Sequence, residues 1–279
     1  MLQFGTLRAC IKVDGVILTP YGIETIVEES KVTCWIPSEV GKNFSVVWQD
    51  TCDFRVYYES GTVTIDGSPS GGQILGPLRS GEPLSYANCT CELRHLRTSG
   101  SSGRPFTFSN LQLTDDDVYL KSAPARLGEI ELTVWPVAPI SLAPWAPIQS
   151  GNNQIVHERA KKAYSHCVGF GNEVALPYVR TLTTRPISAK PFATFVFRYR
   201  PLDRLIADGI APPLRRADKR TVPDDFEDSD GEPGDEAMRE LQALKEHVKR
   251  LERKLVQSRR SSSKRVKAEA CDETIDLTI

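Results

Sequence analysis

The sequence lacks the features that mark membrane-spanning and secreted proteins. No window approaches the roughly eighteen consecutive apolar residues that a transmembrane helix needs. The first residues, MLQFGTLRACIKVDG, show no basic start followed by an apolar run and a cleavage site, so we expect no secretory signal. The 7 cysteines are odd in number and irregularly spaced. They predict free, partly buried thiols rather than a disulfide framework.

The signature motifs of several enzyme classes are also missing. There is no G-x-S-x-G, P-loop, G-x-G-x-x-G or H-E-x-x-H pattern. The acidic run Asp115–Asp117 is typical of a solvated turn, and no further oxygen ligands for a hard cation are evident. Cys89, Cys91 and His95 lack the tighter spacing of common zinc ligands, which favours buried thiols. We therefore predict a protein that is not an enzyme and holds no metal or cofactor.

The first two hundred residues carry the pattern of an all-β domain. Short runs rich in Val, Ile, Thr, Tyr and Phe, such as NFSVVWQD, LGEIELTVWPV and FATFVFRYR, recur between turn signals such as DGSPSGG. This spacing predicts an antiparallel β-sandwich, jelly-roll-like, over residues 1–213. NNQIVHERAKKAYSH and PLDRLIADGI look helical, and the proline-rich VAPISLAPWAPIQSGNN predicts a loop crossing between sheets.

Beyond this domain, the charges separate strongly although the formal net charge is only -1. Residues 214–234 are rich in proline and acid and predict a disordered linker. Residues 235–258 predict a helix that forms a short coiled coil, able to self-associate. Residues 259–279 predict a disordered basic tail. The coiled-coil core positions are Leu241, Leu244, Val248, Leu251 and Leu255.

Two basic clusters flank the predicted helix and suggest import into the nucleus. Simple solvation in a cytoplasmic protein and nonspecific contact with nucleic acid, as in a chromatin-associated factor, are the alternatives. Direct nucleic-acid binding is disfavoured because carboxylates lie nearby and no aromatic residue interrupts the basic runs. The residues are Arg215, Arg216, Lys219, Arg220, Arg259, Arg260, Lys264, Arg265 and Lys267.

The final residues resemble two motifs of the ubiquitin-like modifier SUMO. VKAE matches the acceptor pattern, with Lys267 as the modified lysine, and ETIDLTI resembles the SUMO-interacting motif. An extended peptide of this kind adds a strand to a partner's sheet, with alternate side chains filling pockets. A strand docked on its own domain is the alternative. The motif residues are Ile275, Asp276, Leu277, Thr278 and Ile279.

Three further features suggest switches or ligands. Ser229 has the acidic downstream setting of one kinase class, and Ser262 has the basic upstream setting of another. Tryptophans could form a sugar-stacking platform, although core packing is favoured. The tryptophans are Trp35, Trp48, Trp135 and Trp145.

Dense similarity runs through IKVDGVILTPYGIETIVEESKVTCWIPSEVGKNFSVVWQD, FTFSNLQLTDDDVYL, VHERAKKAYSHCVGFGNEV and ATFVFRYRPLDRLIADGIAPP. These stretches resemble an uncharacterised family of mushroom-type, basidiomycete fungal proteins. The resemblance implies a domain over about residues 1–213 and a fungal origin, but no activity. We expect a nuclear adaptor whose β-domain binds an unknown protein and whose tail binds SUMO or SUMO-modified proteins. A carbohydrate-binding or other ligand-binding sandwich is the alternative.

Overall fold

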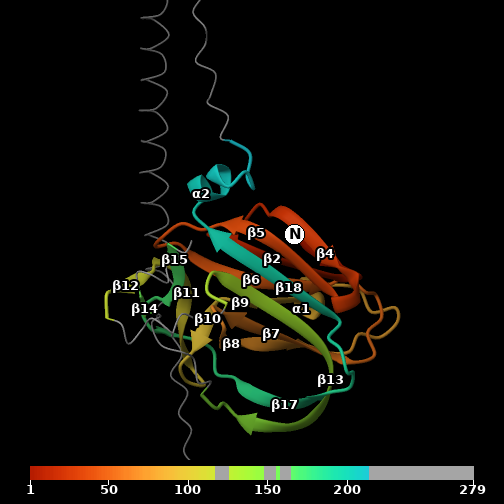
Figure 1. Ribbon diagram of the computed structural model, residues 1–279. Coiled ribbons are helices and arrows are strands. Elements are labelled where there is room, and N and C mark those ends of the chain that lie inside the picture. The colour runs from red at the N-terminus through yellow and green to blue at the C-terminus, as the bar shows by residue number, and fades with distance from the viewer. Residues whose placement is uncertain (117–125, 148–154, 158–164, 214–279) are drawn as a thin grey trace, which may run out of the picture. The chain divides into compact units, whose positions relative to one another are not determined.

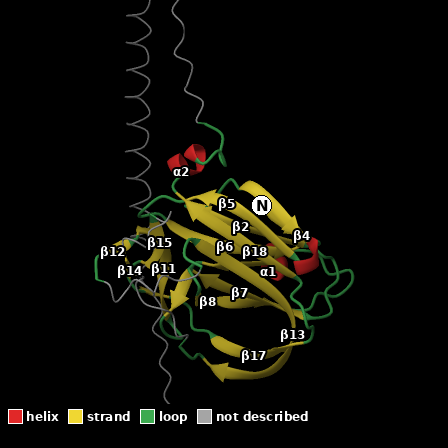
Figure 2. Ribbon diagram, viewed as in Figure 1, coloured by secondary structure: helices red, strands yellow, loops and turns green. Residues whose placement is uncertain are grey.

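A computed structural model describes residues 1–116, 126–147, 155–157 and 165–213. Within these residues the protein is mainly β, as the sequence predicts, with three short helical turns (Figure 2). No helix in this part of the chain is long and apolar enough to cross a membrane. The predicted linker, coiled coil and tail lie outside the described residues. The helical turns are η1 (Val27–Glu29), α1 (Tyr86–Cys89) and α2 (Leu202–Ala207).

The first sheet has nine described strands, with β1-β2-β6-β11-β10 as its main order. Its strand pairs are all antiparallel. Its central strand matches NFSVVWQD, whose Val46 and Trp48 face the core as the alternation predicts. The strands are β1 (Leu2–Phe4), β2 (Leu7–Val13), β3 (Val16–Ile17), β6 (Asn43–Asp50), β9 (Thr90–Leu93), β10 (His95–Arg97), β11 (Ser102–Asn110), β15 (His166–Phe170) and β16 (Val174–Ala175).

The second sheet has seven described strands in the order β4-β5-β18-β13-β7-β8, with β17 paired to β13. It departs from the predicted antiparallel pattern at β5 and β18, which run parallel. Strands so far apart in sequence are free of the hairpin constraint that enforces antiparallel pairing. The strands are β4 (Tyr21–Ile26), β5 (Lys31–Pro37), β7 (Tyr58–Ile65), β8 (Ser68–Leu75), β13 (Glu129–Pro144), β17 (Arg180–Pro186) and β18 (Ala193–Arg200).

The two sheets pack face to face around one apolar core (Figure 1). Trp48 of β6 lies against Gly61 of β7, where an added Cβ would stand only 2.5 Å from the indole ring. Phe108 of β11 contacts Tyr199 of β18, with ring centroids 5.3 Å apart. Glycine at position 61 therefore lets the sheets approach around a fully buried tryptophan.

Two segments differ from the sequence-based predictions. The proline-rich stretch after Val137 is not a loop between sheets, because β13 continues through it to Pro144 and pairs with β17. The prolines are tolerated because this part of β13 has left the body of the sheet. The predicted helix NNQIVHERAKKAYSH contains strand β14 (Ile155–His157), which pairs in parallel with β12 (Gln112–Thr114). Residues 152–154 and 158–164 of that stretch lie outside the described residues.

Candidate functional site

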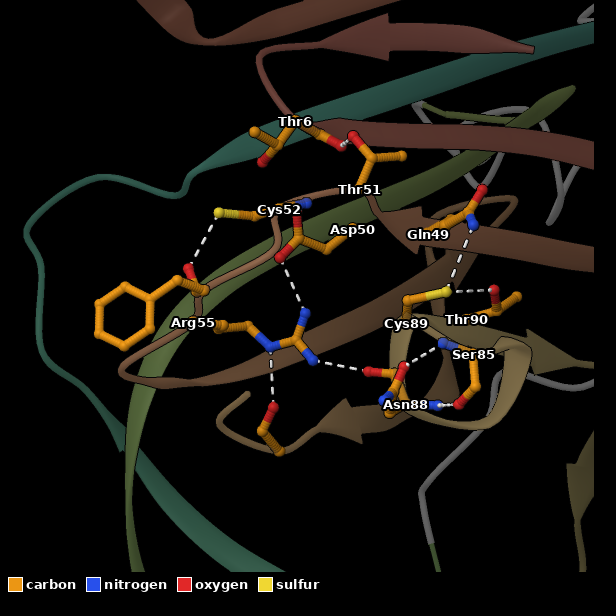
Figure 3. A network of polar contacts seen from close by, with 12 residues as sticks. Thr6, Gln49, Asp50, Thr51, Cys52, Arg55, Ser85, Asn88, Cys89 and Thr90 are labelled. Carbon is orange, nitrogen blue, oxygen red and sulfur yellow. Dashed lines mark hydrogen bonds and ion pairs between the residues drawn. The ribbon is translucent and has the colours of Figure 1, made fainter. Parts of the chain in front are cut away.

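A buried ion pair stands where β6 ends. Arg55 Nη1 donates to Asp50 Oδ2 at 2.8 Å, and the two side chains are only 4% and 1% exposed (Figure 3). Asp50 is the last residue of β6, and Arg55 lies in the loop that leads to β7. Removing both charges from water is costly, so the pair is held by its close geometry and by the further hydrogen bonds of each partner.

Arg55 uses its remaining donors to join separate segments of the chain. Its Nε donates to the Gly76 carbonyl at 2.8 Å, and its Nη2 donates to the Asn88 carbonyl at 2.7 Å. The Arg55 backbone also exchanges two hydrogen bonds with Leu78, at 3.0 and 2.8 Å. One side chain thus fixes the β6–β7 loop against the segment after β8 and against α1.

The α1 segment has its own local restraints. Ser85 Oγ accepts from the Asn88 amide at 3.4 Å, and Asn88 Oδ1 accepts from the Ser85 amide at 2.8 Å. This reciprocal arrangement is a capping box at the start of the turn (Figure 3). Asn88 Nδ2 also donates to the Pro83 carbonyl at 3.0 Å. The carbonyl that receives Arg55 is therefore itself held in place.

The restrained segments display large apolar side chains to solvent. Their exposed fractions range from 46% to 61%. Three lie in the β6–β7 loop on either side of Arg55, and two lie at α1. Tyr86 also donates to Glu92 Oε2 at 3.3 Å, which orients its ring. We call these residues the loop-end surface: Phe54, Val56, Tyr57, Leu84 and Tyr86.

A second carboxyl group lies beside the ion pair. Glu59 is buried, and burial, followed by the nearby Asp50 charge, raises its pKa to about 7, while Arg55 acts in the opposite direction. The Arg55 guanidinium therefore acts electrostatically on the carboxyl groups of both Asp50 and Glu59, but its hydrogen bond goes to Asp50. Glu59 is the group that takes up a proton, because desolvation disfavours its charged form.

A serine–histidine pair lies elsewhere in the domain. Ser38 Oγ lies 2.8 Å from His166 Nδ1, which ties the end of β5 to β15 across 128 positions of sequence. Burial lowers the pKa of His166, partly opposed by the charge of Asp203. Ser38 is 7% exposed, so a substrate would have little access to its hydroxyl. The pair is best explained as a cross-link between the sheets.

Asp66 forms a buried network between β7 and β18. Tyr199 Oη donates to both Asp66 oxygens, at 2.6 and 2.7 Å. The amides of Gly128 and Val168 donate to the same carboxylate at 2.8 and 2.9 Å. Burial raises the pKa of Asp66, and these donors act against that rise. The network joins four segments and is structural, because its donors saturate a carboxylate in the core.

The sequence-predicted site residues fall outside this site. The basic clusters, coiled-coil leucines, serines 229 and 262, Lys267 and the terminal strand all lie outside the described residues. Cys91 packs in the core, and Cys89 Sγ accepts from Gln49 Nε2 at 3.3 Å. No group of potential metal ligands occurs in the described ranges. Asp115 and Asp116 follow β12, and Asp117 is not described.

The tryptophans divide between core and surface. Trp48 is fully buried, whereas Trp35, Trp135 and Trp145 are half-buried. The guanidinium groups of Arg200 and Arg198 lie 4.4 and 5.6 Å from the Trp35 ring centroid. A sugar ring would compete with these cations for the same indole.

Sequence analysis did not identify Asp50, Arg55 and Glu59 as a site. The available signal was a lone arginine between apolar residues in DFRVYY, five positions after a strand-ending aspartate. Such a pattern does not reveal that the arginine turns inward, because its receiving carbonyls come from residues 76 and 88.

Comparisons with known proteins bear on the whole domain. Neither the curated proteins nor the solved structures contain a match to this chain. A family model described as a domain of unknown function, DUF7918, matches residues 6–213. That range spans both sheets and α2. The chain therefore belongs to the DUF7918 family.

Proposed function

We propose that the described domain is a non-enzymatic protein-interaction module that binds a folded protein partner through the loop-end surface. One observation carries this proposal. Five exposed apolar side chains stand on two segments that Arg55 fastens to the domain. Large apolar side chains exposed on restrained segments suit a protein interface, and aromatic residues are enriched in the cores of protein interfaces.

The buried ion pair supports this role physically. Binding costs free energy when loops and side chains must first be ordered, so a surface that is already fixed retains more of its contact energy. Arg55 supplies that order without occupying the surface, because its guanidinium points inward to Asp50 and to two backbone carbonyls.

The tail supplies a second, sequence-based part of the proposal. We propose that Ile275, Leu277 and Ile279 enter a groove on SUMO, with Asp276 meeting its basic rim. The predicted coiled coil would pair two such strands and raise their effective concentration. The basic clusters suit nuclear import, and we propose that the protein is nuclear. A fungal origin and a jelly-roll-like topology of the β-domain are further parts of the proposal.

The loop-end surface can be tested with two matched double variants of the full chain. Phe54→Ser with Tyr57→Ser removes exposed apolar side chains from the surface, and Ile23→Ser with Val27→Ser removes them elsewhere. A partner identified with the wild type is purified and titrated against all three proteins. The proposal predicts lost binding only for the loop-end variant. Equal binding by all three would contradict it.

The tail is tested separately by titrating labelled SUMO with the full chain in NMR. Chemical-shift changes along one SUMO sheet edge are expected, and Ile275→Ala with Leu277→Ala should abolish them. Unchanged SUMO spectra at millimolar protein would remove this part of the proposal and leave the loop-end surface untouched.

A further inference from the structure

The second half of β13 leaves the body of the second sheet and forms a two-stranded ribbon with β17. From Ile130 to Val134 the strand lies between β18 and β7, whereas from Pro139 to Pro144 its only partner among the described strands is β17. In Figure 1 the ribbon lies at the opposite end of the domain from α2. Ile140 and Leu142 on the ribbon are 60% and 58% exposed.

Within the described residues, β17 pairs with β13 and with no other strand, which leaves its outer edge unpaired there. Its sequence RTLTTRP is rich in threonine, which favours strands, and has proline only at its end. The part of β13 that pairs with β17 contains Pro139 and Pro144, and each proline removes an N–H donor from that strand. β17 is therefore the better hydrogen-bonding edge.

The stretch of chain that contains β17 carries charge of one sign. The segment Val174–Leu202 contains five basic residues and no acidic residue. Arg198 and Arg200 of that segment pair with carboxylates. Arg180, Arg185 and Lys190 form no ion pair within the part of the chain that the structure describes. The open edge is thus basic at both ends, beside exposed apolar side chains.

The other edges of the second sheet differ in charge or in access. β4 is also an exposed edge strand, but Glu24, Glu28 and Glu29 make that edge acidic. β8, at the far edge, packs against β9 and β10 of the first sheet. An acidic strand would therefore be attracted to β17 and repelled from β4.

We infer that the β17 edge is a docking site for an extended peptide of a partner protein in which apolar and acidic residues alternate. The peptide adds a strand to β17 through main-chain hydrogen bonds. Because side chains alternate between the two faces of a strand, the peptide's carboxylates lie on one face and meet Arg185, while Arg180 stands at the end of the other face. Its apolar side chains cover Leu142 and Leu182, which are directly paired across the ribbon. These residues are separate from the loop-end surface.

A second copy of this chain fits the same edge poorly. Two β17 strands paired edge to edge would bring Arg180 and Arg185 close to their counterparts, and like charges across strands are destabilising. The chemistry of the edge thus selects an acidic peptide.

The test uses the isotope-labelled full chain and a synthetic peptide of alternating valine and glutamate residues, as long as β17. A peptide of alternating valine and lysine is the control ligand. Only the glutamate peptide should shift the amide signals of Arg180–Pro186, and alternate β17 amides should exchange more slowly with solvent. Affinity should fall by about tenfold or more in Arg180→Glu with Arg185→Glu, because the attractive contact at Arg185 becomes repulsive and position 180 adds a second negative charge to the same edge.

A control charge reversal away from β17 is Lys31→Glu, in β5 where that strand pairs with β4, and it should leave the peptide affinity unchanged. Signals that shift at β4, or only at the basic residues after position 214, would overturn the inference. Equal binding of both peptides would do so too. Self-association that Arg180→Glu with Arg185→Glu abolishes, in a chain that binds no peptide, would assign the edge to a second copy instead.

Discussion

Arg55 and Asp50 form an ion pair closed to solvent, although Phe54 and Val56 on either side of the arginine are 51% and 60% exposed. The loop therefore alternates between a buried anchor and exposed apolar side chains. This arrangement links the stability of the domain to the position of its proposed binding surface.

Removing the anchor should be costly. In Arg55→Ala the Asp50 carboxylate stays buried without its cation, and we expect the free energy of unfolding to fall by about 3–5 kcal/mol. Urea denaturation measures the change. Arg94→Ala is the control, because Arg94 also pairs with a carboxylate at 2.7 Å but is 63% exposed. That variant should lose about 1 kcal/mol or less, and equal losses in both would refute the role of the anchor.

Glu59 should make stability depend on pH. Its pKa is about 7 in the folded protein and 4.5 ordinarily. Between these values the folded protein holds a proton that the unfolded chain releases, so stability falls as the pH rises and levels off above about 7.

Glu59→Gln removes this titration while keeping a neutral polar side chain. The variant should gain stability over the wild type as the pH rises from about 4.5 to 7, by about 3 kcal/mol in total. Denaturation curves collected across that range measure the difference. Parallel pH profiles for the two proteins would show that Glu59 titrates normally.

The Asp66 network gives a third prediction. Tyr199→Phe deletes the hydroxyl that donates to both carboxylate oxygens and leaves a buried group less satisfied. We expect a loss of about 1–3 kcal/mol in unfolding free energy. Tyr178→Phe, at a residue that is 66% exposed, should change stability little. If Tyr199→Phe left the free energy of unfolding unchanged, the Tyr199 hydroxyl would be dispensable for stability.

Packing between the two sheets gives a fourth prediction. In Gly61→Ala the new methyl group would stand 2.5 Å from the Trp48 ring, so the sheets must shift. Overpacking of this kind costs about 1–3 kcal/mol. Gly76→Ala is the control, since its nearest neighbour, Tyr58 Cε1, would be 4.0 Å away. Thermal unfolding of both variants compares them, and similar melting temperatures would argue against tight packing at position 61.

Sequence predicts well the strands in which apolar residues clearly alternate with polar ones. β6 matches NFSVVWQD residue for residue, and β5 places Cys34 and Ile36, two positions apart, in the core. The glycine-rich DGSPSGG predicts a turn, whereas the structure forms β8 there. Its Gly72 instead lies so close to Gly61 that an added Cβ would be 2.4 Å from the Gly61 carbonyl oxygen. Glycine at position 72 allows β8 to lie close to β7. The sequence of β8 alone cannot indicate this role, because it depends on which strand lies beside it.

The candidate site was less predictable for a similar reason. Arg55 bonds to Gly76 and Asn88, and Ser38 meets His166, across long separations in sequence. Local patterns indicate which residues form strands, but they do not indicate which loops meet. Sequence does not predict the ribbon of β13 and β17, because prolines normally exclude a central strand, whereas here they occupy an exposed one.

Site-specific photo-crosslinking in cells that produce the protein tests the loop-end surface most directly. A photoreactive amino acid replaces Tyr57 in one protein and Ile23, which is similarly exposed, in another. We predict that position 57 alone forms a crosslink to a distinct protein. When purified, that protein should bind the wild type and lose affinity for Phe54→Ser with Tyr57→Ser. Crosslinks to the same proteins from both positions, or undiminished affinity for the variant, would contradict the proposal that this surface binds a partner.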